Sequence, residues 1–250
     1  MSNTFLSVIL PAYNEEKRLE STLMALNKFF AGQPVSIEIL VIDDGSKDRT
    51  SQVALELTTV VPGLRVVRNE RNRGKGYSVR RGVGEAEGSI IGFMDADLKT
   101  PIEEIERILP WLANGYGVVI GSRGLRESRI EVAQPMHRRL GSKLFAAVMH
   151  ALVGLPDIVD TQCGFKFFTR AAALEIFRHQ KADGYMFDVE ILCLAQQLGY
   201  RIKQVPIRWM NDPDTRLQLV RGNLRNVVEL LRIRENLKSA YRQQLGEVRR

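Results

Sequence analysis

Two pairs of acidic residues follow apolar runs that are typical of buried strands. One run ends in Asp43 and Asp44, and the run Ile90–Met94 ends in Asp95, with Asp97 two residues further on. In an open sheet of parallel strands, ligands bind beyond the carboxyl ends of the strands. Carboxylates placed there are costly unless a cation, hydrogen-bond donors or water compensate them. Asp95 and Asp97 therefore predict a site for Mg²⁺ or Mn²⁺, whose other ligands would be water and a diphosphate.

The same acidic and hydroxyl side chains could instead cap the helices that follow the strands. That alternative is credible for Ser46 and Asp48, which lie where the next helix should begin. It is weaker for Asp95 and Asp97, because Thr100 opens a capping box, Thr-Pro-Ile-Glu, that already supplies the cap. The metal is the favoured interpretation.

A basic segment with two glycines, residues 71–77, opens a further predicted helix. Its backbone N–H groups and the ammonium of Lys75 could approach a phosphate. The spacing of its glycines is neither that of a P-loop nor that of a dinucleotide-binding fingerprint. The segment therefore disfavours an ATPase or an NAD-dependent enzyme.

These residues need a sheet to bring them together, and the chain predicts one. Strands are expected over Leu6–Leu10, Ile37–Ile42, Leu64–Val67, Ile90–Met94 and Val118–Ile120. Helices are expected over Glu15–Ala31, Asp48–Val60, Tyr77–Ala86 and Pro101–Ala113. Later elements are a basic helix over Arg138–Val153, a strand over Gly164–Thr169, helices from Arg170 and over Phe187–Leu198, and a strand over Ile202–Ile207. This alternation predicts an α/β fold with a mostly parallel sheet flanked by helices.

The net charge of +7 is unevenly placed. Residues 216–250 hold nine Arg or Lys and three Glu, a net charge of +6, and two further basic stretches cover residues 65–81 and 123–143. Such stretches predict anionic partners: phosphates, a membrane surface or nucleic acid. No aromatic residues are interleaved with them, as a platform for single strands would require, so nucleic acid is not expected as a partner. Each stretch could also be an ordinary solvated helix face.

The cysteines and the apolar runs bear on the compartment. Two cysteines, Cys163 and Cys193, in 250 residues favour a reducing compartment. The longest apolar candidate, Leu144–Leu155, is too short to span a membrane. The first residues show no basic stretch followed by an apolar core, so no signal peptide is expected. The three histidines give no zinc pattern. We expect a cytoplasmic protein.

Taken in order, the motifs resemble the family 2 inverting glycosyltransferases with a GT-A fold. The early motifs are Pro11-Ala12-Tyr13-Asn14-Glu15-Glu16, Asp43-Asp44-Gly45-Ser46, Gly74-Lys75-Gly76 and Asp95-Ala96-Asp97-Leu98. The later ones look like the polyprenyl-phosphate branch, above all its dolichyl-phosphate β-glucosyltransferases: Gly121-Ser122-Arg123, Arg138-Arg139-Leu140-Gly141-Ser142, Asp160 to Lys166, and Phe187-Asp188-Val189-Glu190. The resemblance covers residues 5 to 217, and it implies a GT-A domain over 1–217 followed by a basic amphipathic helical tail over 218–250.

The resemblance implies roles for individual residues. The nucleotide sugar would be held by Pro11, Tyr13, Glu15, Asp44, Lys75 and Asp95. The metal, Mg²⁺ or Mn²⁺, would be held by Asp95 and Asp97. The acceptor phosphate would be held by Arg123, Arg138, Ser142 and Arg216. The residues expected to act in catalysis are Asp95, Asp97, Arg123, Arg138, Asp188 and Arg216. The implied reaction moves a hexose, with glucose and UDP-glucose as first choices, to a polyprenyl or dolichyl phosphate at the cytoplasmic face of a membrane.

Two residues leave the chemistry open. Asp188 lies where many inverting relatives with hydroxyl acceptors have their catalytic base, but here it could instead orient an arginine or bind the sugar. A lipid phosphate is already ionised near pH 7 and needs no strong base. Lys99 stands where mannosyl relatives place a glutamine that binds the metal, and a protonated lysine cannot ligate a metal. Lys99 therefore implies a thinner metal shell or a contact with phosphate.

Several alternatives remain at this level. The donor could be GDP-mannose, or the acceptor could be a soluble phosphorylated acid gripped by the same arginines. A non-catalytic nucleic-acid-binding protein would explain the charge but not the carboxylates at the strand ends. The tail could dock on an anionic membrane, or it could pack on the body with a wet basic face. Truncation after Leu217 is expected to weaken vesicle binding while UDP binding is kept. The sequence leaves the oligomeric state undecided.

Overall fold

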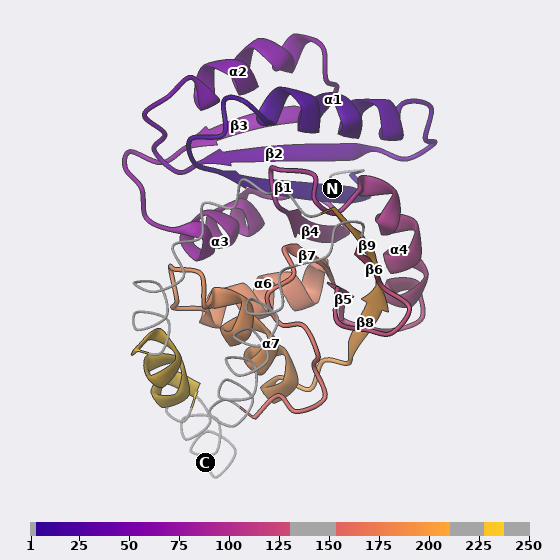
Figure 1. Ribbon diagram of the computed structural model, residues 1–250, viewed down its shortest axis with the longest axis vertical. Helices are drawn as coiled ribbons and strands as arrows, with labels where there is room; N and C mark the ends of the chain where they lie inside the picture. Colours follow the sequence, from indigo (N-terminus) through magenta and orange to yellow (C-terminus); the bar gives the residue numbers. More distant parts are fainter. Residues whose placement is uncertain (1–3, 131–153, 211–227, 238–250) are drawn as a thin grey trace.

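The predicted apolar runs pair into a central sheet. The structure, a computed structural model, describes residues 4–130, 154–210 and 228–237. Within these ranges seven strands form one sheet in the order β3-β2-β1-β4-β7-β5-β8 (Figure 1). Their bounds are β1 Leu6–Ala12, β2 Ile37–Asp43, β3 Leu64–Arg68, β4 Ile90–Met94, β5 Val118–Ser122, β7 Phe165–Thr169 and β8 Ile202–Pro206. Every neighbouring pair is parallel except those of β7, which is antiparallel to β4 and β5. The prediction of a mostly parallel sheet is confirmed.

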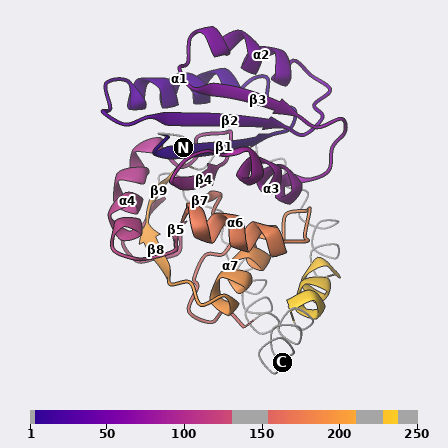
Figure 2. The ribbon, with the colours of Figure 1, turned by 180° about the vertical axis from the view of Figure 1, so that it is seen from behind.

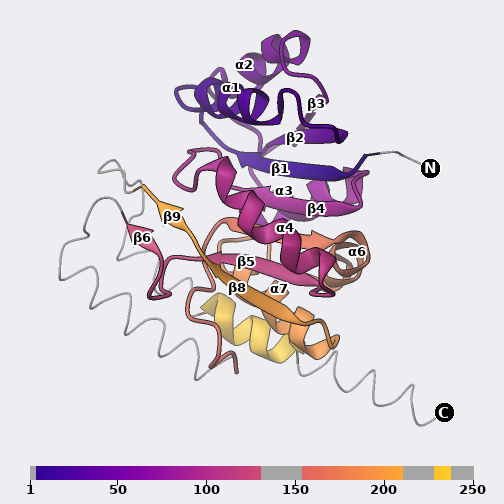
Figure 3. The same ribbon diagram turned by 90° about the vertical axis from the view of Figure 1, so that its right-hand side faces the viewer.

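Helices cover both faces of this sheet. The α-helices are α1 Leu19–Phe30, α2 Thr50–Glu56, α3 Lys75–Glu85, α4 Ile105–Ala113, α6 Arg170–His179 and α7 Phe187–Gln197, with short 3₁₀ turns η1 Leu57–Thr59 and η2 Ile102–Glu104. Seen from its side, the sheet has α4 in front of it and α3, α6 and α7 behind it (Figure 3). Figure 2, which shows the molecule from behind the view of Figure 1, also has α3, α6 and α7 on the side of the sheet away from α4.

Alternate residues of each strand feed two separate cores. Ile9, Leu40 and Phe93 belong to a buried cluster that includes residues of α3, α6 and α7. Val8 and Val41 point the other way, into a cluster with residues of α1, α2 and α4. Successive side chains of a strand point to opposite faces, so a sheet covered on both faces must be apolar at nearly every position. This explains why the strands appear in the sequence as unbroken apolar runs.

The predicted helix starts need correction. The first helix begins at Leu19 rather than Glu15, because the backbone before it bonds to the start of α2: the Glu15 N–H donates to Thr50 Oγ1 at 2.7 Å. The second ends at Glu56 and continues as η1. The predicted capping box at Thr100 is wrong, since Pro101 is the N-cap of η2 and no side chain caps it. The argument that Thr100 relieves the nearby aspartates of a capping role therefore fails.

The antiparallel strand β7 places the residues of the site. The register of β4 against β7 pairs Met94 with Phe165, so the end of β4 lies beside the start of β7. On the other side β7 pairs with β5, which ends at Ser122. Three strand termini therefore meet at one edge: the ends of β4 and β5, and the turn that precedes β7.

Two short strands were not predicted from the sequence. They are β6, Arg129–Ile130, and β9, Arg208–Trp209, which pair in parallel away from the main sheet (Figure 3). The Met210 N–H beyond β9 donates to the Lys99 carbonyl at 2.8 Å. This small sheet therefore lies next to the loop that carries Asp97.

Part of the predicted tail is described, and it packs on the body. Residues 228–237 are helical and lie beside α7 (Figures 1 and 3). Leu230, Ile233 and Leu237 are buried in the same cluster as residues of α7, whereas Val228 and Leu231 are exposed. These residues therefore match the second alternative given for the tail, a helix that packs on the body of the protein. The domain boundary after residue 217 lies outside the described residues and stays a prediction. None of the described helices has both the length and the apolar character needed to cross a membrane.

Candidate active site

Asp95 follows β4 directly and is seated by the turn before β7. Its N–H donates to the Gly164 carbonyl at 3.1 Å. A Cβ on Gly164 would lie 2.2 Å from Asp95 Oδ2, so only glycine leaves room for this carboxylate. The side chain of Asp95 remains 46% exposed. Asp95 is therefore fixed at its base and open at its tip, as a ligand for an incoming group must be.

Lys75 is the cation nearest to Asp95. Its Nζ lies 2.5 Å from Asp95 Oδ1, and it is the first residue of α3. Burial opposes ionisation of both groups, but their mutual attraction outweighs it: the pKa of Lys75 is raised above its usual value, and the pKa of Asp95 is lowered below its own. Arg123 and Lys166 add to the lowering at Asp95. Both groups of the pair are charged at neutral pH.

Asp97 is held by Lys99 on the same loop. Lys99 Nζ lies 3.0 Å from Asp97 Oδ2, and the Lys99 N–H donates to Asp97 Oδ1 at 3.3 Å. Between them, Leu98 has a φ of 53°, which is unfavourable for a residue with a side chain. Strained backbone of this kind persists where a functional loop requires it. Lys99 is thus placed against the second aspartate.

The donor set at this edge fits a hard divalent cation. It consists of two carboxylates, and no group of three or more His, Cys, Asp or Glu that could hold a metal occurs among the described residues. Mg²⁺ and Mn²⁺ are commonly held by one or two carboxylates and complete their shells with water and phosphate oxygens. Asp95 and Asp97 therefore suit a metal that arrives together with a diphosphate better than a metal caged by protein alone.

Arg123, which follows β5, is gripped by Asp160. The guanidinium donates to both carboxylate oxygens, from Nε at 2.7 Å and from Nη2 at 2.8 Å, and the Arg123 N–H donates to the same carboxylate at 2.9 Å. Burial opposes the charge of Asp160, but these hydrogen bonds lower its pKa below the usual value. Arg123 also lies over the Trp209 ring, with 5.5 Å between the guanidinium carbon and the ring centroid. A bidentate pair fixes the orientation of the arginine.

Asp188 is engaged by a buried lysine. Lys166, the second residue of β7, is fully buried, and its Nζ donates to Asp188 Oδ1 at 2.5 Å and to the Cys163 carbonyl at 2.6 Å. Asp188 lies in the first turn of α7 with a side chain only 5% exposed. Glu190, two residues further along α7, supports the loop before this helix. Its carboxylate accepts hydrogen bonds from the Lys181 and Ala182 N–H groups.

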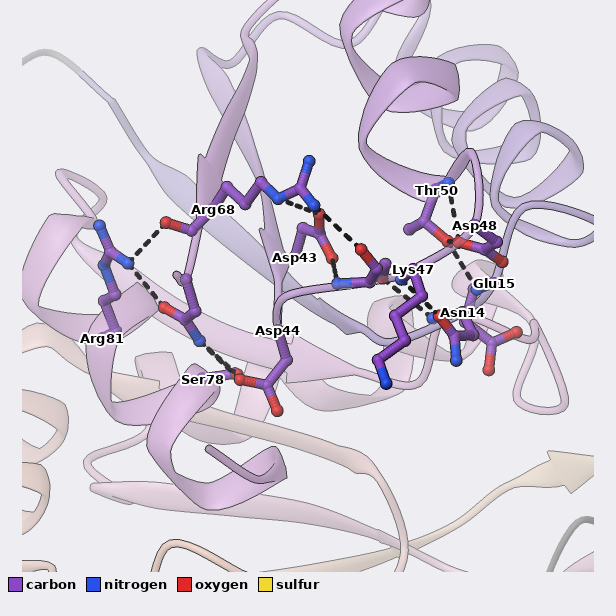
Figure 4. A network of polar contacts seen from close by, with 12 residues as sticks. Asn14, Glu15, Asp43, Asp44, Lys47, Asp48, Thr50, Arg68, Ser78 and Arg81 are labelled. Atoms are coloured by element: carbon purple, nitrogen blue, oxygen red, sulfur yellow. Dashed lines mark hydrogen bonds and ion pairs between the residues drawn. The ribbon is translucent and has the colours of Figure 1, made fainter. Parts of the chain in front are cut away.

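Asp44 organises the glycine-containing segment that carries Lys75. Its carboxylate accepts hydrogen bonds from the Arg73 N–H at 3.0 Å, the Gly74 N–H at 2.8 Å and Asn69 Nδ2 at 2.7 Å. Gly74 has a φ of 107°, and a Cβ there would lie 2.3 Å from the Asp183 carbonyl. Asp44 lies at the end of β2 beside Asp43 (Figure 4). It therefore fixes the chain immediately before the N-terminus of α3.

The loops after β1 and β2 are tied together by side-chain hydrogen bonds (Figure 4). Asn14 Oδ1 accepts from the Lys47 N–H at 2.9 Å, and its own N–H donates to Ser46 Oγ at 3.0 Å. Asp48 accepts from the N–H and the hydroxyl of Thr50. The predicted capping role of Ser46 and Asp48 is wrong, because Arg49 is the N-cap of α2 and no side chain caps that helix. Ser46 instead helps to join the two loops. The joined loops present Tyr13, 38% exposed, at the edge of the sheet.

Comparison of the sequence with models of protein families identifies the family of this chain. The model described as "Glycosyl transferase family 2" matches residues 7–177. The chain belongs to glycosyl transferase family 2. The protein is therefore a glycosyltransferase, and the resemblance on which the sequence motifs relied is confirmed.

Curated relatives of this family 2 glycosyltransferase include several that are named dolichyl-phosphate beta-glucosyltransferase. A dolichyl-phosphate beta-glucosyltransferase of Trichomonas vaginalis is 34% identical over 244 residues, covering 92% of this chain and 72% of that protein. The enzyme of that name from Dictyostelium discoideum is 35% identical, with 94% and 75% covered. The human one is 35% identical, with 85% and 69% covered.

Solved structures confirm the GT-A fold. Glucosyl-3-phosphoglycerate synthase from Mycobacterium tuberculosis, crystallised with phosphoglyceric acid, aligns with a TM-score of 0.69 at 24% identity, covering 92% of this chain and 80% of that one. The same enzyme with Mn²⁺, uridine-diphosphate and phosphoglyceric acid aligns with a TM-score of 0.67 at 24% identity, with 92% and 78% covered. At this identity the likeness shows the fold.

The structure brings one group of the predicted site residues together and leaves another group undescribed. Lys75 Nζ bonds to Asp95 Oδ1, and the register of β7 against β4 and β5 brings the end of β5, just before Arg123, to the same edge of the sheet. Pro11 lies within β1. Glu15 lies in the loop after this strand, with its Oε2 at 3.7 Å from Arg18 Nη1. Arg138, Ser142 and Arg216, expected to hold the acceptor phosphate, lie outside the described residues. Their roles and the nucleotide-binding roles stay predictions.

Sequence reasoning missed two charged residues of the site. Asp160 and Lys166 are the first and last residues of a motif that the resemblance singled out, but neither was given a role. Asp160 could have been found from the sequence. Like Asp95, it is an acidic residue in a loop next to a predicted buried strand. Cys163, expected as a small packed residue, is 2% exposed, and burial raises the pKa of its thiol to about 12.

Proposed function

We propose that this glycosyltransferase transfers glucose from UDP-glucose to dolichyl phosphate or a related polyprenyl phosphate, with inversion at the sugar carbon. The observation that carries the proposal is the meeting of strand ends at one edge of the sheet, where the turn before β7 contacts Asp95 through Gly164 and Arg123 through Asp160. A donor diphosphate at Asp95 would there adjoin an acceptor phosphate at Arg123. The names of the curated relatives supply the sugar and the lipid.

The donor half of the site is built by residues after β1, β2 and β4. Asp95 and Asp97 would hold Mg²⁺ or Mn²⁺, which when bound stabilises the negative charge that develops on the departing diphosphate. Lys75, 2.5 Å from Asp95, is positioned to contact a phosphate oxygen of the donor. Pro11, Tyr13, Glu15 and Asp44 would line the base and ribose, on the two loops that the network in Figure 4 joins. The crystallisation of a structural neighbour, glucosyl-3-phosphoglycerate synthase, with Mn²⁺ and uridine-diphosphate supports this choice of donor and metal.

The acceptor half of the site depends on arginines. A lipid phosphate carries its own negative charge near pH 7, so its oxygen can attack without a strong general base. It must, however, approach a second anion, the donor diphosphate, and guanidinium groups lower that repulsion by charge-assisted bidentate bonds. Arg123 is already oriented by Asp160, and Arg138, Ser142 and Arg216 would complete the grip. Attack from the face opposite the diphosphate inverts the anomeric carbon.

A membrane surface is the place where such an acceptor is found. The exposed part of helix 228–237 includes Val228 and Leu231 beside Arg232, Arg234 and Glu235, a mixture of apolar and mainly basic side chains that suits an anionic interface. We propose that the enzyme works as a peripheral protein, on the cytoplasmic face. Free, buried Cys163 and Cys193 are compatible with a reducing compartment.

A second candidate differs only in its acceptor. The structural neighbours are named as synthases of glucosyl-3-phosphoglycerate, so a soluble phosphorylated acid is an alternative partner for Arg123. The donor half of the site would be unchanged.

A transfer assay with the purified chain separates these candidates. UDP-glucose, UDP-galactose and GDP-mannose are each offered with polyprenyl phosphate or 3-phosphoglycerate, with Mn²⁺ or Mg²⁺. We expect product only from UDP-glucose with polyprenyl phosphate. Product from 3-phosphoglycerate alone would establish the second candidate, and product from GDP-mannose alone would contradict the proposed donor.

A further inference from the structure

Lys166 is a buried lysine that contacts the turn on which Asp95 of the candidate active site rests. It is the second residue of β7, a strand with neighbours on both sides, and pairs with Phe93 of β4 and Ile120 of β5. Its side chain is fully buried, and its Nζ lies 5.6 Å from the centroid of the Phe93 ring. Removing a lysine from water is costly, and a buried ion pair seldom repays the cost in stability. A position in the centre of the sheet therefore calls for a role other than stability.

The two hydrogen bonds of Lys166 join α7 to the turn before β7. One goes to Asp188 at the start of α7, and the other goes to the carbonyl of Cys163. The residue after Cys163 is Gly164, whose carbonyl receives the Asp95 N–H and whose missing side chain makes room for the Asp95 carboxylate. Lys166 thus holds the segment against which Asp95 rests.

The same turn orients the arginine of the acceptor half. It begins at Asp160, whose carboxylate takes three hydrogen bonds from Arg123. A shift of the turn would therefore disturb Asp95 on β4 and Arg123 on β5 together. Placement errors of about 1 Å can cost about 100-fold in rate when groups must be aligned for reaction.

Asp188 is poorly placed for the role of a catalytic base. Its side chain is 5% exposed, and one carboxylate oxygen is bonded to Lys166 at 2.5 Å. A base must instead reach the proton of the acceptor.

We propose that Lys166 is a positioning residue of the transfer site, that it fixes the turn 160–164 under Asp95 and Arg123, and that Asp188 acts through Lys166 and not as a general base. The inference rests on the proposed function and extends it to the support of the reacting groups. It assigns Asp188 the task of anchoring the ammonium of Lys166 at the start of α7, where a carboxylate is favoured by the helix dipole.

Three variants of the full chain test the proposal. Asp188→Asn removes the charge but keeps an oxygen that accepts from Lys166. Lys166→Met removes the ammonium and leaves Asp188 buried without its cation. Lys166→Met combined with Asp188→Leu removes both charges, which avoids an orphaned carboxylate and is expected to fold, but still leaves the Cys163 carbonyl without its donor. Lys203→Met, a lysine of β8 that lies over the Trp111 ring, is the matched control.

The proposal predicts different results for these variants. Asp188→Asn keeps kcat within about tenfold of the wild type and keeps the shape of its pH profile. Lys166→Met and the double variant lose about 100-fold in kcat, although the double variant melts close to the wild type. In the metal-free proteins, amide hydrogen exchange at Asp95 and in residues 160–164 accelerates in the double variant and stays unchanged in Asp188→Asn and Lys203→Met.

Two results would overturn the proposal. One is a loss of 1000-fold or more in Asp188→Asn with unchanged amide exchange, which would make Asp188 the base. The other is a folded double variant with wild-type kcat and wild-type exchange, which would leave Lys166 without a role in the site. If the wild-type chain transferred no sugar to any acceptor, the proposed function would fail, and the exchange measurement would still decide the role of Lys166 in seating Asp95.

Discussion

At the scale of single residues, the site depends on the neighbours of its functional groups, which leave space for them or orient them. Asp95 can stand at the end of β4 only because Gly164 has no side chain. Asp160 similarly determines how Arg123 is presented, by accepting hydrogen bonds from Nε and Nη2 along one edge of its guanidinium. Each of these neighbours gives a prediction that concerns one position.

Replacing Gly164 with alanine should disable the site without unfolding the protein. The new Cβ would lie 2.2 Å from Asp95 Oδ2, so the carboxylate must move away. We expect a loss of about 100-fold in the rate of glucose transfer, measured under saturating donor and metal. Gly84→Ala is the control, since a Cβ there meets nothing within 4 Å and alanine suits the helix better than glycine. Equal activity of the two variants would show that Asp95 need not stay where it is.

The Arg123–Asp160 pair should make stability depend on pH in the acid range. The pKa of Asp160 is lowered from 3.8 in the folded protein, so the ionised carboxylate stabilises the fold above that pH. This contribution is lost as the pH falls through the lowered pKa. Asp160→Asn should therefore cost about 2 kcal/mol of the free energy of unfolding at pH 7, and the cost should shrink below about pH 4. Denaturant unfolding of both proteins from pH 2.5 to 7 measures it, and a cost independent of pH would refute the pairing.

At the scale of elements, the function depends on where strands end and how their loops are tied. The loop that precedes α3 is held by Asp44 from the end of β2, and the turn before β7 is held by Lys166. Both supports cross from one element to another, so both are invisible to any pattern within one element.

Asp44→Ala tests the support of the α3 loop. Without the carboxylate, the Arg73 and Gly74 N–H groups lose their acceptor, and Lys75 is no longer held against Asp95 by a fixed backbone. We expect UDP binding to weaken by about 10- to 100-fold, from the loss of hydrogen bonds to a charged group, measured by calorimetry. Glu56→Ala, at an exposed ion pair of α2, should leave affinity unchanged. Unaltered affinity in Asp44→Ala would exclude this role.

The fold and the donor half of the site could be predicted from the sequence. Contacts between side chains of different elements, such as that of Lys166 with Asp188, could not. Asp95 and Asp97 could be found because apolar strands that end in carboxylates form a local pattern. Lys166 could not, because a lysine between Phe165 and Phe167 alternates as a solvent-facing residue would. Only the helices on both faces of the sheet, together with Asp188 some twenty residues away, make it a buried cation. The start of α1 was misplaced for a similar reason, since the Thr50 hydroxyl that accepts from the Glu15 N–H belongs to another element, the first residue of α2.

At the scale of the whole molecule, the C-terminal helix is both part of the core and part of the surface. Leu230, Ile233 and Leu237 are buried with residues of α7, so truncation after residue 217 would remove core side chains and could not report on vesicle binding alone. The opposite face of the helix carries exposed Arg232 and Arg234 next to Val228 and Leu231. Substitutions on that face are the suitable test.

Reversing the charge of Arg232 and Arg234 should weaken membrane binding and leave the fold intact. Each basic residue near an anionic surface contributes about 1 kcal/mol, so we expect at least about 30-fold weaker binding to vesicles that contain phosphatidylserine. Co-sedimentation gives the affinity, and UDP binding should be unchanged. Lys28→Glu with Arg178→Glu changes the net charge equally on exposed positions of α1 and α6. Equal weakening by both pairs would mean that total charge, and not this helix, drives binding.

The most direct test of the central claim concerns Asp97. If Asp95 and Asp97 together seat a divalent ion on the donor diphosphate, Asp97→Ala should lower the Mn²⁺-dependent rate of glucose transfer from UDP-glucose to polyprenyl phosphate by at least about 1000-fold, since several kcal/mol of charge stabilisation are lost. The melting temperature should remain near that of the wild type. A folded Asp97→Ala protein that transfers glucose at the wild-type rate, with the same dependence on Mn²⁺, would contradict the account.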